Sequence, residues 1–336
     1  MKPTQPLYVH GLGHFHPENI VDNKFLEELD IGTNDAWILE RVGILRRRTV
    51  LPLDYIRDTK NSDIAAAHEV TVYTNQETGR RAGVHALERA GLKPSDIGMV
   101  VTGGCTPEMA IPSEACRVAA ALDIDAPALD INSACSSFGA QLHMLSNMGN
   151  LPPYVLVVNP ENTTRNINYA DRSAAVLWGD CTSAAIVSTQ VPSRIRIVET
   201  TLASNPARWD AVTIGRFKHF AQEGSAVQRF AIKTTGSCLD ALYPAAREYA
   251  EANGGSARFV GHQANYLMLQ GVARRSKIEP ELHWHNVEEY GNTGAAGAPS
   301  VLSQNWDNLK DGDSIVVVVV GSGLTWSSLR MEIGAA

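Results

Sequence analysis

The stretch Asp130-Ile131-Asn132-Ser133-Ala134-Cys135-Ser136-Ser137-Phe138-Gly139 determines how the rest of the chain is read. Apolar residues at 128, 129 and 131 predict the end of a short buried strand. Three apolar residues then follow at helical spacing: Phe138, Leu142 and Leu145. Small residues crowd the junction between strand and helix, so the backbone is expected to turn sharply and to present Cys135 above the turn.

Cys135 is the residue of this stretch whose chemistry the sequence pattern addresses most directly. A thiol at the N-terminus of a helix faces unpaired backbone N–H groups and the positive end of the helix dipole, and both favour the thiolate. The same N–H groups are suited to an oxyanion. Two interpretations stay open on this stretch alone: Cys135 is a nucleophile, or it is a small buried hydrophobe, as most free cysteines are.

Composition narrows the class of protein. The 336 residues are 44% hydrophobic and 19% charged, which is typical of a globular protein with one or two domains. The net charge of −7 argues against nucleic acid or a membrane surface as the main partner. The start of the sequence lacks the pattern of a signal peptide, and the longest apolar run, residues 315–320, is far too short to span a membrane. Five cysteines without a CxxC pair favour reduced thiols and a cytoplasmic location.

Strand and helix patterns alternate along the whole chain. Strands are expected at 7–12, 98–102, 154–158, 184–187, 195–202, 258–261 and 315–320. Helices are expected at 63–90, 112–121, 238–252 and 267–275, whereas residues 46–63 read as polar and irregular. No linker divides the chain, so the pattern predicts an α/β sandwich of two similar lobes.

Three later motifs offer partners for a reactive thiolate. Residues 260–265 (Val-Gly-His-Gln-Ala-Asn) place His262 at a strand end, where active-site side chains gather, although a lone histidine there is more often structural. Residues 290–297 (Tyr-Gly-Asn-Thr-Gly-Ala-Ala-Gly) leave Asn292 as the sizeable polar donor. They lack the Gly-Lys-Ser/Thr ending of a nucleotide loop. Residues 321–326 (Gly-Ser-Gly-Leu-Thr-Trp) form a glycine turn able to direct an N–H at a carbonyl.

Together these motifs resemble the ketoacyl synthase III family of thiolase-fold enzymes. The resemblance extends to residues 11–13, 37–44, 86–92 and 175–180, and the residues Cys135, His262 and Asn292 follow one another in the order of the family's catalytic triad. It implies a five-layered αβαβα sandwich with an N-terminal lobe (residues 1–173) that carries the nucleophile. The C-terminal lobe (residues 174–336) carries the histidine and the asparagine.

The resemblance also implies a reaction. Cys135 takes an acyl group from an acyl thioester, and backbone N–H groups of Cys135, Ser322 and Gly323 hold the oxyanion. His262 and Asn292 then bind a malonyl thioester, whose decarboxylation gives the carbanion that attacks the acyl-cysteine. The substrates are acyl-coenzyme A or acyl carrier protein and a malonyl thioester, with no further cofactor.

Binding positions follow from the same resemblance. Trp37 and Arg41 resemble the coenzyme A platform, and Arg274 and Arg275 the basic pair that meets acyl carrier protein. Ile111 corresponds to a side chain that crosses the interface of a homodimer to close the partner's acyl tunnel. An aromatic residue is common there, so isoleucine predicts a roomier or differently shaped pocket. Three further residues are expected at the substrate: Phe138, Gln263 and Asn265.

Some positions depart from the family pattern. Asn132 and Ser133 stand where alanines are frequent, and Cys181 begins a segment that is usually rich in glycine and alanine. With Ile111, these changes favour a specialised fatty-acid or polyketide pathway. Ser322 stands near the position where a biosynthetic thiolase needs a second cysteine, which disfavours a thiolase.

Other functions are weighed against condensation. An acyltransferase on the same fold would move the acyl group from Cys135 to an alcohol, an amine or a carrier protein, with His262 as general base. A non-catalytic carrier-binding subunit is disfavoured because Cys135 is present. The pairs His14/His16 and His283/His285 supply only two ligands each, so no metal site is predicted.

Overall fold

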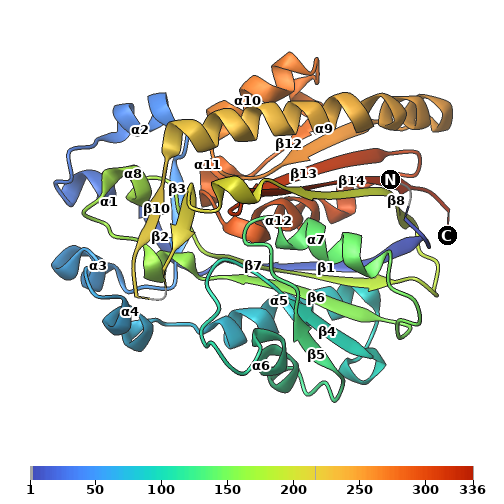
Figure 1. Cartoon of the computed structure of the whole chain (residues 1–336), viewed down its shortest axis with the longest axis horizontal. Helices are drawn as coiled ribbons and strands as arrows, with labels where there is room; N and C mark the ends of the chain where they lie inside the picture. Colours follow the sequence, from blue (N-terminus) through green and yellow to red (C-terminus); the bar gives the residue numbers. More distant parts are fainter. Residues whose placement is uncertain (1–2, 216, 336) are drawn as a thin grey trace.

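The computed structural model describes residues 3–215 and 217–335. Ten strands form one mixed sheet in the order β12-β11-β13-β14-β8-β1-β7-β6-β4-β5 (Figure 1). The first five in the chain are β1 (Leu7–Phe15), β4 (Met99–Thr102), β5 (Ala128–Asp130), β6 (Val155–Glu161) and β7 (Cys181–Ser188). The second five are β8 (Ile195–Ser204), β11 (Ala257–Gly261), β12 (His283–Trp284), β13 (Ser314–Gly321) and β14 (Thr325–Ile333).

The two halves of this sheet repeat one topology. Antiparallel pairing of β1 with β8 joins them, and from that seam the strands run β1-β7-β6-β4-β5 on one side and β8-β14-β13-β11-β12 on the other. In each half the two outermost pairings are parallel: β4 with β5 and β6, and β11 with β12 and β13. Strand β7 pairs with β1 and β6, so it lies with the strands of the first half. The division into lobes after residue 173 stays a prediction.

Helices lie on both outer faces and between the two halves (Figure 1). The helices α5 (Asn75–Ala90) and α6 (Glu114–Ala121) cover the first half, and α9 (Gly224–Asn253) and α10 (Tyr266–Arg275) cover the second. Between the halves lie α7 (Ser137–Leu145) and α12 (Gly297–Gln304), which contact strands on both sides. The predicted α/β sandwich of two similar, layered halves is confirmed.

Smaller elements frame one end of the sandwich. The helices are α1 (Asn23–Glu28), α2 (Asp35–Arg41), α3 (Leu53–Thr59), α4 (Ile64–Val70), α8 (Arg172–Ala175) and α11 (Val287–Tyr290). Two short antiparallel pairs complete the structure: β2 (Asn19–Asp22) with β3 (Arg46–Thr49), and β9 (Val212–Ile214) with β10 (Phe220–Gln222).

The core between the two halves explains why the central helix forms. Phe138, Leu142 and Leu145 are fully or almost fully buried on α7, where they pack with valines of β6 and β13. Removing side chains of this size from water stabilises a fold by about 1.5–3 kcal/mol each. The predicted helical spacing after Cys135 is therefore confirmed.

Four secondary-structure predictions were wrong. The expected helix 63–90 is two helices, because the β-branched run after Val70 is extended and Thr74 starts α5 with a capping box to Glu77. Residues 46–63 are not irregular, since they contain β3 and α3. Strand β5 is not buried, because it lies at the edge of the sheet, where Leu129 is 38% exposed. The helix expected from 238 begins at Gly224 and carries Pro244 in its interior.

Close packing of α5 on β1 depends on a glycine. A Cβ added to Gly13 would lie 2.1 Å from the backbone oxygen of Ala82, a contact that side-chain movement cannot relieve. In the part of the chain that the structure describes, no helix is long and apolar enough to cross a membrane.

We expect Gly13→Ala to lower the free energy of unfolding by about 1–3 kcal/mol, because α5 has to move away from the sheet. Urea unfolding followed by circular dichroism measures the change. Gly271→Ala is the matched control, since a Cβ there meets open space on α10 and the substitution is expected to stabilise by about 0.5–1 kcal/mol. Equal stability of wild type and Gly13→Ala would contradict the packing argument.

Candidate active site

Cys135 sits in a strained turn between β5 and α7. Ala134 has φ +47°, a left-handed conformation that an L-residue adopts only under constraint. The Asn132 Oδ1 atom accepts a hydrogen bond from the Ala134 N–H at 2.8 Å, and the Ser133 carbonyl accepts one from the Ser136 N–H at 3.0 Å. Asn132, which departs from the family pattern, therefore stabilises the turn that places Cys135 just before α7.

His262 and Asn292 come from the second half of the sheet. His262 directly follows β11, and Asn292 follows Gly291, which has φ +68°. The Gly294 N–H donates to Asn292 Oδ1 at 3.1 Å. Since the carboxamide oxygen is thereby engaged, the Nδ2 group is the part of Asn292 that is left to donate to a ligand.

Cys135, His262 and Asn292 line one cavity of about 290 Å³. The three side chains are only 6–7% exposed, so the cavity is their main access to solvent. Trp37, Arg41 and Asn265 line the same cavity. Helix α9 and the β9–β10 hairpin supply much of the rest of the wall: Val212, Phe220, Val227, Gln228, Phe230 and Ala231. The cavity thus extends from an aromatic and basic region to the triad.

A second chamber of about 180 Å³ begins at Cys135. It shares five residues with the larger cavity: Cys135, Trp178, Val212, Phe220 and Ser322. Its remaining wall is formed by Gly104, Cys105, Asn132, Ala134, Thr213 and Ile214. Cys135 therefore lies where the larger cavity and the second chamber meet.

A second thiol adjoins the first. The Cys105 Sγ atom lies 3.4 Å from the Cys135 Sγ atom, which is hydrogen-bond distance for two sulfur atoms. This hydrogen bond is the largest cause that lowers the pKa of Cys135 to about 5, and a hydrogen bond and the charge of His262 add to it against the effect of burial. The pKa of Cys105 is raised well above its usual value by the same hydrogen bond and by burial. Cys135 is the thiolate of the pair, and Cys105 holds the proton.

A buried carboxyl group lies beneath both thiols. Glu161, at the end of β6, accepts the Cys105 N–H on both oxygens, at 3.1 and 3.0 Å, and the Ala295 N–H at 2.8 Å. Burial and the negative charge of Cys135 raise the pKa of Glu161 to about 8. Glu161 thus connects the loop after β4 to the loop that carries Asn292.

The glycine turn predicted to serve the oxyanion packs directly against Cys135. A Cβ on Gly321 would lie 2.8 Å from the Ser136 nitrogen and 3.1 Å from the Cys135 nitrogen, so a side chain there would crowd these N–H groups. The Ser322 hydroxyl is occupied by the Val212 carbonyl. Gly321 and Ser322 line the larger cavity, whereas Gly323 does not.

Several predicted residues lie away from the cavity. Phe138 is 1% exposed in the core of the sandwich, and Gln263 is fully buried with its Nε2 on the Gly261 carbonyl and its Oε1 on the Asn286 N–H. Ile111 is 84% exposed beyond the end of β4 and does not line its own chain's cavity. Arg274 and Arg275 are exposed in the last turn of α10.

Sequence reasoning missed three residues of this region. The guanidinium carbon of Arg172 lies 4.8 Å from the centre of the Trp37 ring. That of Arg41, the residue predicted for this role, lies 5.5 Å from it. Cys105 and Glu161 were also missed. Their position in the sequence could have indicated them. Cys105 follows the end of β4 and Glu161 ends β6, so both lie at the carboxyl ends of parallel strands, where the active sites of α/β proteins are found.

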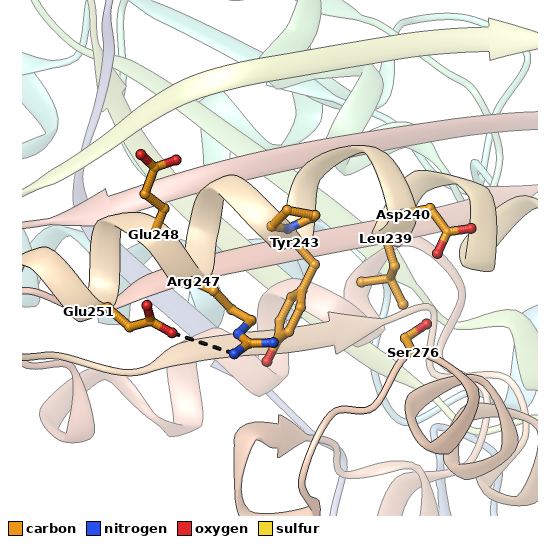
Figure 2. A pocket seen from close by; sticks show the side chains of 8 residues that line it. Leu239, Asp240, Tyr243, Arg247, Glu248, Glu251 and Ser276 are labelled. Carbon is orange, nitrogen blue, oxygen red and sulfur yellow. Dashed lines mark hydrogen bonds and ion pairs between the residues drawn. The ribbon is translucent and has the colours of Figure 1, made fainter.

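A separate hollow lies on the outer face of α9 (Figure 2). It is lined by Leu239, Asp240, Tyr243, Pro244, Arg247, Glu248, Glu251 and Ser276. Its Arg247–Glu251 ion pair is long, at 3.5 Å, and exposed, so it contributes little. The hollow shares no residue with the triad's cavity.

The histidines of the first pair, His14 and His16, are engaged in other contacts. His14 Nδ1 is 2.8 Å from the Ser303 hydroxyl, and His16 stacks on Tyr290. Within residues 3–215 and 217–335, no group of three or more His, Cys, Asp and Glu side chains is arranged to hold a metal ion.

Comparison with known proteins identifies the class of enzyme. Residues 129–206 match the model of 3-oxoacyl-[acyl-carrier-protein (ACP)] synthase III, and residues 255–333 match that of its C-terminal part. The crystal structure of 3-oxoacyl-[acyl-carrier-protein] synthase III from Aquifex aeolicus is similar, with TM-score 0.83 and 25% identity over 97% of this chain and 99% of that one. The priming β-ketosynthase of the R1128 polyketide pathway has TM-score 0.78 and 26% identity over 100% and 98%.

Curated relatives are similar over their full length. The beta-ketoacyl-[acyl-carrier-protein] synthase III of Caldanaerobacter subterraneus is 32% identical, covering 95% of both chains, and that of Campylobacter jejuni is 30% identical, covering 96% of this chain and 97% of its own. The chain belongs to the beta-ketoacyl-[acyl-carrier-protein] synthase III family. The resemblance stated from the sequence motifs is therefore confirmed, as is the thiolase-like fold.

We expect Cys135 to be alkylated by iodoacetamide at a nearly constant rate from pH 8 down to pH 6, because its thiolate persists above a pKa of about 5. The rate falls about tenfold per pH unit only below that value. Peptide mass spectrometry after timed quenching measures the rate at Cys135. Free glutathione is the reference, since an unperturbed thiol loses reactivity already below pH 8. A parallel decline of both rates between pH 8 and 6 would contradict the lowered pKa.

Proposed function

We propose that this enzyme forms carbon–carbon bonds by decarboxylative Claisen condensation of an acyl thioester with a malonyl thioester. The observation that carries the proposal is that Cys135, His262 and Asn292 line one largely buried cavity, with a second chamber beyond the nucleophile. A nucleophile and two hydrogen-bond donors at one place are the groups that this reaction needs.

Acylation of Cys135 is the first half-reaction. The thiolate attacks the carbonyl carbon of the acyl thioester, and backbone N–H groups of Cys135 and of the 321–323 turn hold the oxyanion. The carrier thiolate leaves and takes up a proton. Because the chamber next to Cys135 is small and partly polar, we expect it to accept a short acyl group.

Condensation is the second half-reaction. His262 and the Asn292 Nδ2 group donate hydrogen bonds to the carbonyl oxygen of the malonyl thioester. Loss of carbon dioxide leaves an enolate whose negative charge these donors stabilise in a site with little water. The carbanion attacks the acyl-cysteine, a β-ketoacyl thioester forms, and Cys135 is released as the thiolate.

Asn292 favours this reaction over simple acyl transfer. Transfer to an alcohol or amine requires one general base, which His262 alone would supply. A second donor directed into the same cavity has a role when an enolate must be stabilised. The names of the relatives, which are ketoacyl synthases including a polyketide priming enzyme, favour condensation as well.

The mouth of the cavity supports a coenzyme A or carrier-protein donor. Trp37 presents a ring flanked by the guanidinium groups of Arg41 and Arg172, a suitable site for an adenine and its phosphates. Arg274 and Arg275 offer exposed positive charge to an acidic acyl carrier protein.

A homodimer is part of this proposal. The edge strand β5 leaves backbone groups and Leu129 exposed, and Ile111 is exposed after the neighbouring strand β4. A second copy that covers this edge would bring Ile111 toward the partner's acyl chamber. With isoleucine in place of an aromatic side chain, the closure would be less bulky.

The test is the intact mass of the protein after mixing with a panel of acyl thioesters and then with malonyl thioester. We expect a mass gain that Cys135→Ser abolishes and that malonyl thioester clears with release of carbon dioxide. Clearance only by an alcohol or an amine would establish an acyltransferase instead. Absence of any acylation would overturn the proposal.

For Asn292→Ala we expect release of carbon dioxide from malonyl thioester to fall by about 10²–10³-fold, because one enolate donor is lost. Acylation of Cys135 is expected to persist, since Asn292 is not among the causes that lower the Cys135 pKa. Radiolabelled carbon dioxide and intact mass measure the two half-reactions. His262→Ala should lose decarboxylation and also acylate more slowly. Unchanged decarboxylation in Asn292→Ala would refute its role.

For Trp37→Ala we expect KM for an acyl-coenzyme A donor to rise by roughly 5- to 30-fold, because the stacking platform is removed. Its kcat should change little, as Trp37 is not one of the three residues proposed to carry the chemistry. Trp209→Ala is the matched control, since Trp209 is 68% exposed and lines neither chamber. Equal KM values for the two variants would contradict the platform.

A further inference from the structure

The two adjacent thiols of the active site are more than condensation requires. One thiolate suffices as nucleophile, yet the Cys105 Sγ atom lies 3.4 Å from the Cys135 Sγ atom, and both line the chamber of about 180 Å³. The backbone of each cysteine is fixed: the Cys105 N–H by Glu161, and Cys135 by the turn before α7. The short distance is therefore set by the fold.

We propose that Cys105 and Cys135 form a reversible disulfide when the enzyme meets a peroxide. The site modified is the nucleophile itself, and Cys105 is the resolving thiol. The proposal does not depend on which acyl group or carrier the enzyme uses.

The chemistry balances with hydrogen peroxide as the oxidant. The Cys135 thiolate attacks one peroxide oxygen, the O–O bond breaks, and Cys135 becomes a sulfenic acid while hydroxide leaves. That hydroxide takes the proton from the Cys105 thiol. The Cys105 thiolate attacks the Cys135 sulfur, the S–O bond breaks, and a second hydroxide leaves and is protonated to water. Two thiols lose two electrons, and one peroxide becomes two waters.

The local charges assign the two roles. Cys135 lies at the N-terminus of α7 beside His262, where negative charge is stabilised, so it is the sulfur that reacts with peroxide. The Cys105 sulfur is held in a hydrogen bond by Cys135 and is buried beside its negative charge, where a second negative charge is disfavoured. It stays protonated until a leaving hydroxide removes its proton.

Closure needs only a small movement. The two sulfurs have to approach by roughly 1.4 Å to reach a disulfide bond length of about 2.05 Å. Because both side chains border an open chamber, rotation about their side-chain bonds meets space. An acyl group on Cys135 would block the reaction, so substrate should protect the pair.

Cys181 and Cys116 are placed less well for this role. Cys181 is fully buried, 3.7 Å from His16 Nε2, with its pKa raised above the usual range. Cys116 is exposed on α6 and lines neither chamber, and its Sγ atom accepts a hydrogen bond from the Ser113 hydroxyl. Cys116 is the natural control.

The test treats the full-length enzyme with hydrogen peroxide and determines its intact mass without reductant. We expect the loss of two hydrogens, a Cys105–Cys135 cross-linked peptide after proteolysis, and loss of Cys135 alkylation. Dithiothreitol should restore both mass and alkylation. Cys116→Ala should behave as wild type. Prior acylation of Cys135 should prevent the mass loss.

Cys105→Ala separates this proposal from simple oxidation of the nucleophile. We expect this variant to gain oxygen at Cys135, up to the sulfinic acid, and not to recover with dithiothreitol. Wild-type enzyme that accumulates sulfinic acid at Cys135 without a cross-linked peptide would overturn the proposal, as would a cross-link to any other cysteine. The peptide mass map of the oxidised wild-type enzyme shows whether the disulfide forms even if Cys105→Ala folds poorly.

Discussion

The carboxyl group of Glu161 is the contact on which the arrangement of the site depends. Its oxygens receive the N–H of Cys105 from one half of the sheet and the N–H of Ala295 from the loop of the other half. The Thr163 hydroxyl donates a further hydrogen bond at 3.0 Å. Two loops that are 190 residues apart in sequence are held together by one buried side chain, and Cys105 and Asn292 lie on these two loops.

Burial of Glu161 and the hydrogen bond between Cys105 and Cys135 invert the usual order of protonation at this site. In an unfolded chain Glu161 would ionise near pH 4.5 and Cys135 near pH 9, whereas in the folded protein the pKa of Glu161 is about 8 and that of Cys135 about 5. A raised carboxyl pKa makes stability fall as the pH rises from 4.5 to 8. A lowered thiol pKa makes stability rise as the pH increases from 5 to 9. Between pH 5 and 8 the pair binds one proton in both states, so the thiolate is obtained without a net change of stability with pH.

Sequence reasoning reached the fold and the family, and it predicted a triad whose three residues line one cavity, because each rests on local patterns. Apolar strands, the helical spacing after Cys135 and three glycine-rich turns can be recognised in the sequence without knowledge of tertiary contacts. It failed where contacts between distant segments decide the outcome. Glu161 reads as an ordinary acidic residue after a strand, and only the fold shows that it is buried beneath Cys105. Gln263 reads as part of a catalytic motif, and only the fold shows that both ends of its amide are engaged in the interior.

The repeated topology gives Cys105 a counterpart. In each half one strand lies between two parallel neighbours: β4 between β5 and β6, and β11 between β12 and β13. His262 follows β11, and Cys105 follows β4. Likewise Cys135 follows β5, as Asn292 follows β12 by a longer loop. The site is thus built from four equivalent strand ends, two from each half, and the fold presents four side chains at its centre. The proposed condensation uses three of them, which leaves Cys105 at the fourth position, within reach of Cys135 and available for a different chemistry.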